Sequence, residues 1–204
     1  MNTARSVPLL VIGLVAPVLQ GADACCCSAA EKPAGAATAT AISARSIYQL
    51  DATWTTDGGT ALKLAELRGR PVVVAMFFTS CGYACPRIVE AMTQIQQTLP
   101  PAARDRARFV LISFDDVRDT AAALNAYRTR HGLDAGSWVL LRGAPDDIRE
   151  LAAVLGVKYK KDSAGLFSHS NLITVLDSEG EIIHQRTGLE GGLVEASRAV
   201  VAAR

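Results

Sequence analysis

The feature that most restricts the fold is an apolar run followed at once by two cysteines and a helical pattern. Residues 71–78 are apolar throughout, which is typical of a strand buried on both faces of a sheet. Cys81 and Cys85 follow, and residues 87–99 carry apolar side chains at helical spacing. Pro86 lacks an amide hydrogen and suits a first helical turn, so we expect the helix to begin near Cys85. The two thiols therefore lie on a strand-to-helix turn.

The remaining elements continue this alternation of strands and helices. We expect an N-terminal hairpin with an Asp-Gly-Gly turn, two further buried strands, two helices, a second hairpin and a last helix. Their ranges are 46–55 and 60–64 for the first hairpin, 108–114 and 137–141 for the strands, 119–131 and 145–155 for the helices, 172–176 and 181–186 for the second hairpin, and 189–203 for the last helix. This order predicts a thioredoxin-like α/β fold, with an N-terminal β-hairpin and a central mixed sheet flanked by helices.

The first 45 residues differ in character from the rest of the chain. An apolar stretch follows Arg5, but proline and glycine interrupt it, so it fits an export signal better than a membrane-spanning helix. We interpret residues 1–24 as a signal peptide or membrane-targeting segment and residues 25–45 as a flexible linker with a cysteine cluster. Residues 46–204 form the expected domain. Cys25 is a candidate for lipidation, as in a bacterial lipoprotein; the alternative is a soluble exported protein.

Composition sets the size of the domain and excludes one class of partner. Half of the 204 residues are apolar, which is enough for one domain with a sizeable core. The chain has 21 basic and 20 acidic residues and no basic stripe, so we do not expect it to bind nucleic acid.

Two thiols on a strand-to-helix turn indicate either redox chemistry or binding of a soft metal. Three residues separate Cys81 from Cys85, where a thioredoxin-type dithiol has two, and this favours a metal. The positive end of the helix stabilises thiolates, which suit copper(I), and an added imidazole would make a trigonal site that also holds copper(II). A structural disulfide between Cys81 and Cys85 is an alternative. Zinc is a weaker one, because no fourth strong ligand is evident.

The chain offers three histidines as a third ligand. His131 falls at the end of an expected helix, where a cation complements the helix dipole. His184 falls in the second strand of the last hairpin, where a histidine is more often a surface residue. His169 directly precedes the strand expected at residues 172–176, in a loop that faces the cysteine turn of a thioredoxin-like fold. We therefore predict His169 as the ligand.

These segments resemble the SCO (SenC) proteins. Residues 54–86 are similar to the opening of that family, with its Asp-Gly hairpin, Leu-Arg-Gly-Arg-Pro strand entry and C-x-x-x-C-P turn. Residues 113–120 resemble its S-x-D-P-x-R-D-T segment, and His169 lies where the family carries a metal-binding histidine. The resemblance extends from about residue 47 to the C-terminus. It implies a copper protein with Cys81, Cys85 and His169 as ligands, which helps to assemble the binuclear copper centre of cytochrome c oxidase.

The resemblance also implies a role, a partner and a location. We expect a copper metallochaperone rather than an enzyme, which passes copper by ligand exchange to the copper-accepting subunit of a respiratory oxidase or a similar copper enzyme. It would work on the periplasmic side of a bacterial cytoplasmic membrane, exported or held there by its N-terminal segment or a lipid.

The main alternative is a thiol-disulfide reductase that keeps the copper-binding cysteines of the partner reduced. Thioredoxin-type oxidoreductases have a cis-proline in the loop before the strand expected at residues 172–176. No proline follows Pro145 in this chain, which favours the metal. A thiol peroxidase and a copper-responsive sensor are further alternatives.

Three positions depart from the family pattern. Gly82 replaces the proline after the first cysteine, Ser168 replaces the aspartate that commonly precedes the histidine, and Asp116 replaces the proline of the S-x-D-P segment. We expect these changes to affect metal affinity and partner choice more than the fold. Residues 115–120 are interpreted as a cluster at a helix N-cap, without a direct chemical role.

Overall fold

The structure, a computed structural model, describes residues 42–163 and 167–203. The targeting segment expected at residues 1–24, Cys25 and most of the expected linker lie outside these residues. Within the described part of the chain, no helix is both long enough and apolar enough to cross a bilayer.

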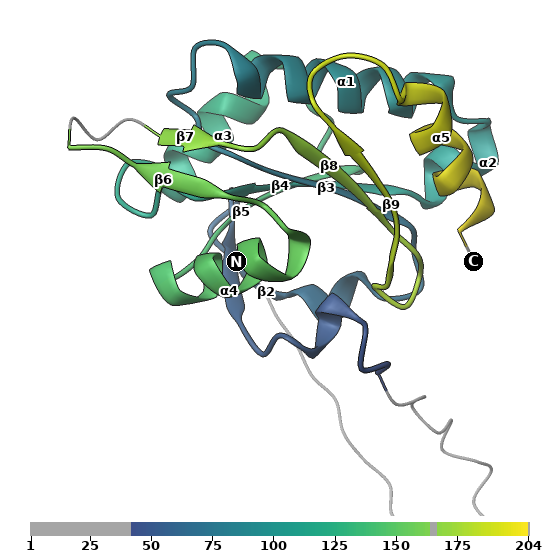
Figure 1. The fold of residues 1–204 in the computed structure, drawn as a ribbon, viewed down its shortest axis with the longest axis horizontal. Helices are drawn as coiled ribbons and strands as arrows, with labels where there is room; N and C mark the ends of the chain where they lie inside the picture. The colour runs from purple at the N-terminus through teal and green to yellow at the C-terminus, as the bar shows by residue number, and fades with distance from the viewer. Residues whose placement is uncertain (1–41, 164–166, 204) are drawn as a thin grey trace, which may run out of the picture. The chain divides into compact units, whose positions relative to one another are not determined.

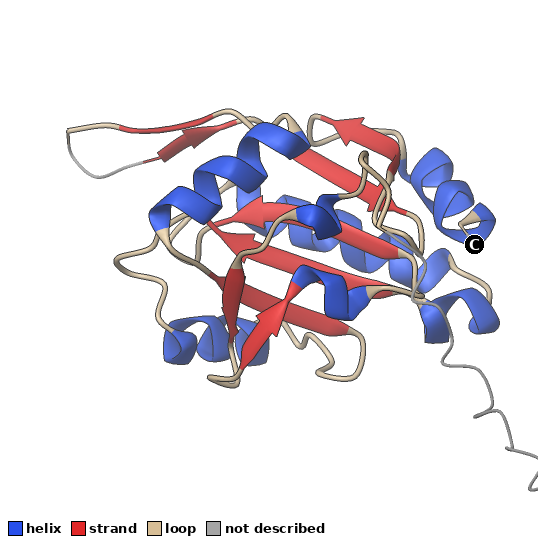
Figure 2. Cartoon of the chain, turned by 90° about the horizontal axis from the view of Figure 1, so that it is seen from below, coloured by secondary structure: helices blue, strands red, loops and turns tan. Residues whose placement is uncertain are grey.

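A mixed sheet forms the centre of the domain (Figure 2). It has seven strands in the order β2-β1-β5-β4-β3-β8-β9. The inner strand β3 pairs in parallel with β4 and antiparallel with β8. All six residues of β3 are buried, as the apolar run predicts. The strands are β1 (Thr53–Thr56), β2 (Ala61–Lys63), β3 (Val72–Phe77), β4 (Arg108–Ser113), β5 (Trp138–Arg142), β8 (Leu172–Leu176) and β9 (Ile182–Thr187).

Helices cover both faces of this sheet, as Figure 1 shows. Helices α1 and α5 pack together on one face, and α4 lies on the other. The apolar stripe of α1, with Ile88, Met92 and Ile95, is fully buried. The helices are α1 (Ala84–Thr98), α2 (Pro101–Arg106), α3 (Ala121–Arg130), α4 (Pro145–Leu155) and α5 (Leu193–Ala202).

Three expected boundaries were wrong for local reasons. Residues 46–52 do not belong to the first strand, because the Ser46 side chain accepts the Tyr48 N–H and starts a short 3-10 helix, Ile47–Gln49. We expected Pro101 to stop the preceding helix, but it also begins a new one, α2, since proline fits a first helical turn. The last helix begins four residues late, because the two glycines before it, at 191 and 192, have φ values of 70° and 68°.

A second, two-stranded sheet is the element that the sequence pattern did not predict. It pairs β6 (Tyr159–Lys161) with β7 (Phe167–His169), in the register Tyr159↔His169. His169 therefore ends a short strand and does not lie in a loop as we expected. The hairpin packs on the sheet through Phe114, whose ring centroid lies 5.2 Å from that of Tyr159 and 5.0 Å from that of Phe167.

Candidate metal centre

The turn between β3 and α1 closes around the sulfur of Cys81. The backbone N–H of Cys81 donates to the Phe78 carbonyl at 3.3 Å, and the N–H of Cys85 donates to Cys81 Sγ at 3.3 Å. Cys81 is half-buried, whereas Cys85, in the first turn of α1, is fully buried. Both thiols are unbridged. The turn therefore presents one sulfur at the surface and one beneath it.

His169 reaches the same point from the end of β7. Its Nε2 lies 3.7 Å from Cys85 Sγ, and its Nδ1 lies 3.1 Å from the backbone oxygen of Ser170. Because a carbonyl oxygen only accepts, Nδ1 carries the ring proton, and Nε2 presents its lone pair toward the sulfur. This is the orientation that a metal-binding histidine needs.

The three candidate ligand atoms of Cys81, Cys85 and His169 all lie within 4.8 Å of one another. Metal–sulfur and metal–nitrogen bonds of about 2.0–2.3 Å place the ligands of one trigonal ion roughly 3.5–4 Å apart. One ion therefore fits between them after small side-chain movements. Two thiolates and an imidazole are a donor set that suits copper.

The surroundings of the two thiols shift their pKa values in opposite directions. Burial disfavours the thiolate of Cys81, but hydrogen bonds from the backbone N–H groups of Cys85 and Tyr83 outweigh it, so the pKa of Cys81 is lowered from its ordinary 9.0. Burial raises the pKa of Cys85 far above 9.0, although a backbone hydrogen bond at Phe78 opposes this. Near neutral pH the metal-free protein thus holds a reactive outer sulfur and a protonated inner one. Binding a metal to both releases the inner proton.

Asp119 connects the cysteine turn to the neighbouring strand. This fully buried carboxylate accepts the Thr79 backbone N–H at 2.9 Å and the hydroxyls of Thr79 and Ser113. Thr120 caps α3 as expected, by accepting the Ala123 N–H at 3.2 Å. The N-cap interpretation was therefore right for Thr120 and wrong for Asp119. The signal for this contact in the sequence was Ser113 at the end of an apolar strand, with Asp119 shortly after it.

Aromatic rings surround the imidazole. The His169 ring centroid lies 5.1 Å from that of Phe114 and 6.0 Å from that of Phe78, which meets Phe114 at 5.3 Å. These rings fix the plane of the imidazole and keep water from its inner side. The outer side faces an open pocket of about 470 Å³, which Cys81, Tyr83 and His169 help to line.

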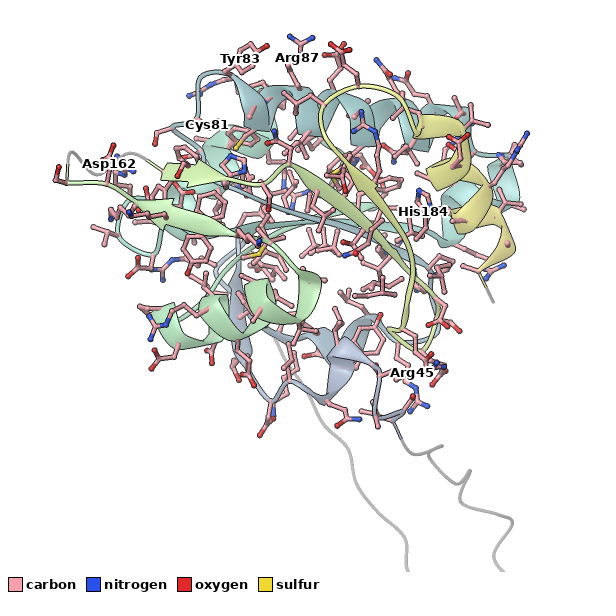
Figure 3. The ribbon with its side chains drawn as sticks, in the orientation of Figure 1. Arg45, Cys81, Tyr83, Arg87, Asp162 and His184 are labelled. Carbon is pink, nitrogen blue, oxygen red and sulfur yellow. The ribbon has the colours of Figure 1, made fainter. Side chains whose placement is uncertain are left out.

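The other two histidines lie elsewhere. His131 follows α3 and stacks on Tyr127, with the ring centroids 4.1 Å apart. His184 lies on β9, well away from Cys81 (Figure 3). Among the described residues, the cluster of Cys81, Cys85 and His169 is the one group of three histidine, cysteine or acidic side chains found with this spacing. The structure thus brings together the three residues that the sequence singled out.

Comparisons with known proteins show which family this chain matches. The family model described as SCO1/SenC matches residues 43–196. A search of curated proteins by sequence finds no match. Many solved structures are similar to this chain.

Three of these structures illustrate the likeness. ScoI from Bradyrhizobium japonicum, solved with copper bound, is 23% identical with a TM-score of 0.63, over 75% of this chain and 97% of that one. A SCO1/SenC family lipoprotein from Bacillus anthracis is 21% identical with a TM-score of 0.68, over 74% and 91%. BsSco is described as having a disulfide switch and as a member of the Sco family of cytochrome c oxidase assembly proteins. It is 22% identical with a TM-score of 0.62, over 74% and 92%. These likenesses confirm the expected thioredoxin-like α/β fold.

Proposed function

Because the chain belongs to the SCO1/SenC family, we propose that it binds copper through Cys81, Cys85 and His169 and helps to mature the copper centre of a respiratory oxidase. The observation that carries this proposal is the convergence of two sulfurs and an imidazole nitrogen within 4.8 Å. The copper bound to the Bradyrhizobium ScoI and the assembly role in the description of BsSco support it.

The exposure of the ligands favours delivery of copper over permanent storage. Cys81 and His169 line an open pocket, so a thiolate of a partner protein can reach the metal and replace one of them. As copper leaves, the thiol of Cys85 regains its proton, because burial raises its pKa. Proton uptake at this buried sulfur would therefore favour release. Three ligands allow such an exchange without unfolding the site.

A thiol-disulfide reductase is the second candidate, and the asymmetry of the two thiols favours it. The thiolate of Cys81 would attack the disulfide of a partner and form a mixed disulfide. The sulfur of Cys85, losing its proton, would then attack Cys81 Sγ, which leaves the partner with two thiols. Two electrons pass to the partner, and Cys81 and Cys85 end as a disulfide. His169 has no necessary part in these steps.

The role of His169 separates the two functions. The reduced full chain, loaded with copper(I), is mixed with a copper-free dithiol acceptor, and transferred copper and consumed thiols are measured together. Chaperone function predicts that His169→Ala lowers copper loading and transfer, whereas the matched variant His184→Ala keeps both. The reductase would be favoured by two results together: His169→Ala reduces a disulfide substrate at the rate of the parent, and the parent does not transfer copper.

We further propose that the protein is exported and held by a lipid on Cys25, on the periplasmic side of the cytoplasmic membrane. The interrupted apolar stretch before Ala24 and the Bacillus relative described as a lipoprotein support this. Mass spectrometry of the membrane-bound protein should find an acylated Cys25 at its N-terminus. Cys25→Ser should shift the protein to the soluble fraction, and an unmodified, membrane-bound Cys25→Ser variant would contradict the anchor.

A further inference from the structure

A cationic hollow on the β6–β7 hairpin adjoins the pocket of the metal site, because Ser168 and His169 line both. Lys158 and Lys160 border a hollow of about 300 Å³ on this hairpin, and His169 lines the same hollow. Both lysines are exposed. None of the salt bridges found between described residues involves either of them. Their charges therefore face solvent beside a ligand of the site.

The pairing of the hairpin explains why Lys160 has no acidic neighbour across the strand. Lys160 stands directly opposite Ser168, next to His169, in the register of β6 and β7. Directly opposed side chains in an antiparallel pair lie close enough for a carboxylate to pair with a lysine. Serine at position 168 supplies no charge, so the lysine remains available to another molecule.

The other side of the entrance carries an aromatic ring and an arginine. Tyr83 lines the pocket with Cys81, and its side chain is exposed although it is large and partly apolar (67%). The guanidinium of Arg87 lies 5.4 Å from the centre of the Tyr83 ring, and both project from the start of α1 (Figure 3). Tyrosine and arginine are the residues that most often dominate binding at protein interfaces.

Positive charge beside the site would assist the exchange of copper. Copper(I) held by two thiolates carries a net negative charge, and an incoming thiolate is negative as well, so the two repel each other. Cations beside the entrance offset that repulsion and steer an anionic partner toward the metal. Screening limits such effects to about 8 Å at physiological salt, so only charges near the entrance act strongly. Asp162, which directly follows β6, is an acidic residue on the same hairpin.

We propose that Lys158, Lys160, Tyr83 and Arg87 form a docking surface for a partner protein whose copper-accepting cysteines are flanked by acidic side chains. This inference rests on the proposed function and specifies the partner of the same site. The lysines provide the attraction, and Tyr83 with Arg87 provides the contact area.

The test uses two synthetic peptides as probes. Both contain the same pair of cysteines, flanked in one by glutamates and in the other by glutamines at the same positions. Fluorescence anisotropy measures the binding of each peptide to the metal-free full chain, and mixing experiments measure the rate of copper(I) transfer from the loaded full chain. We expect the acidic peptide to bind more tightly and to receive copper about tenfold faster at low salt, with the advantage shrinking as salt rises.

Variants assign this preference to the proposed surface. The double variant Lys158→Gln/Lys160→Gln, and separately Ser168→Asp, should abolish most of the preference for the acidic peptide. In the lysine variant, transfer to the glutamine peptide should fall much less than transfer to the acidic peptide. The control double variant Arg45→Gln/Lys63→Gln removes two exposed cations, Lys63 at the end of β2 and Arg45, which lies far from the hairpin (Figure 3), and should keep the preference.

Each outcome decides the proposal. Equal binding of the two peptides, or a preference that survives in the lysine variant, would overturn the docking surface even if copper binding is confirmed. If the chain does not bind copper(I), the anisotropy of the metal-free protein still tests the surface. Binding of the same lysines to vesicles that contain phosphatidylglycerol, without a preference for the acidic peptide, would also overturn it and would indicate a membrane contact.

Discussion

Asp119 shows how a residue that touches no metal can control a metal site. Its buried carboxylate accepts hydrogen bonds from Thr79, in the turn before Cys81, and from Ser113 at the end of β4. In Asp119→Asn the new amide N–H group would face one of these hydrogen-bond donors. This should lower the free energy of unfolding by about 1–3 kcal/mol. We expect the turn to loosen and copper(I) affinity to fall about tenfold, as measured by urea unfolding and by competition with a chelator.

A neighbouring aspartate provides the control. Asp115 is also fully buried, but it pairs with Arg118, and among the described residues its side chain makes no hydrogen bond with the cysteine turn. Asp115→Asn should therefore lower stability with little change in copper affinity. Parent-like copper affinity in Asp119→Asn, or an equal loss of affinity in both variants, would show that Asp119 has no positioning role.

The two thiols should differ in reactivity. Because the pKa of Cys81 is lowered and that of Cys85 is raised by burial, iodoacetamide should modify Cys81 first in the reduced, metal-free protein. The rate at Cys81 should fall only as the pH drops through a value below 9.0, while Cys85 stays slow up to pH 9 and beyond. Peptide mapping by mass spectrometry resolves the two sites. Faster modification of Cys85 would contradict the assignment of outer and inner sulfur.

At the scale of an element, the β6–β7 hairpin brings the histidine to the cysteines, and Phe114 fixes it there. Phe114→Leu should cost about 1–3 kcal/mol of stability, because it leaves a gap among Phe78, Tyr159 and Phe167. It should also weaken copper binding by about tenfold, as His169 loses its support. Urea unfolding and chelator competition measure the two effects.

Phe109 lies on β4, the strand that Phe114 directly follows, and is a matched control. It is fully buried and stacks on Trp138, with ring centroids 5.0 Å apart, away from the hairpin. Phe109→Leu should cost a similar amount of stability and leave copper affinity at the parent value. If both variants lose copper affinity in proportion to stability, the proposal that Phe114 holds His169 in place is wrong.

The elements also show which parts of the structure can be read from sequence. The buried strand β3 and the amphipathic helix α1 were predictable, because long runs of one pattern specify them. The β6–β7 hairpin was not, because each strand has three residues and the pair is held by aromatic contacts with the distant Phe114. His169 was nonetheless found, since the strand after it was clear and the topology places its start near the cysteine turn. The contact of Asp119 with the cysteine turn was missed because Thr79 lies 40 residues away along the chain.

The stability of the whole domain should fall in alkali. Burial raises the pKa of Tyr48 and Tyr127 from 10.0 and that of Cys85 from 9.0, all to values that are reached only well above pH 10. A raised pKa stabilises the fold below the value of the unfolded chain, and this contribution is lost as the pH rises. The free energy of unfolding should thus decrease from about pH 9 upward through Cys85 and from about pH 10 upward through the two tyrosines, by about 1.4 kcal/mol per pH unit for each group. The lowered pKa of Cys81 acts in the opposite direction.

Tyr127→Phe tests the origin of this slope. The Tyr127 hydroxyl has no hydrogen-bond partner among the described residues, so the variant should differ little from the parent at pH 7. Above pH 10 it should lose less stability per pH unit, because one group no longer titrates. Urea unfolding of the reduced, metal-free protein between pH 7 and 10.5 measures both effects, and a stability that does not change with pH would exclude the proposed cause.

The most direct test of the whole account is the equilibrium binding of copper(I) to the chain with Cys25, Cys26 and Cys27 changed to serine, which removes competing thiols. This parent should bind one copper(I). Cys81→Ser and Cys85→Ser should lose tight binding, and His169→Ala should weaken it by about tenfold or more, whereas His131→Ala and His184→Ala should match the parent. Stoichiometric binding that persists in all three ligand variants, or an absence of binding by the parent, would contradict the copper site on which the account is built.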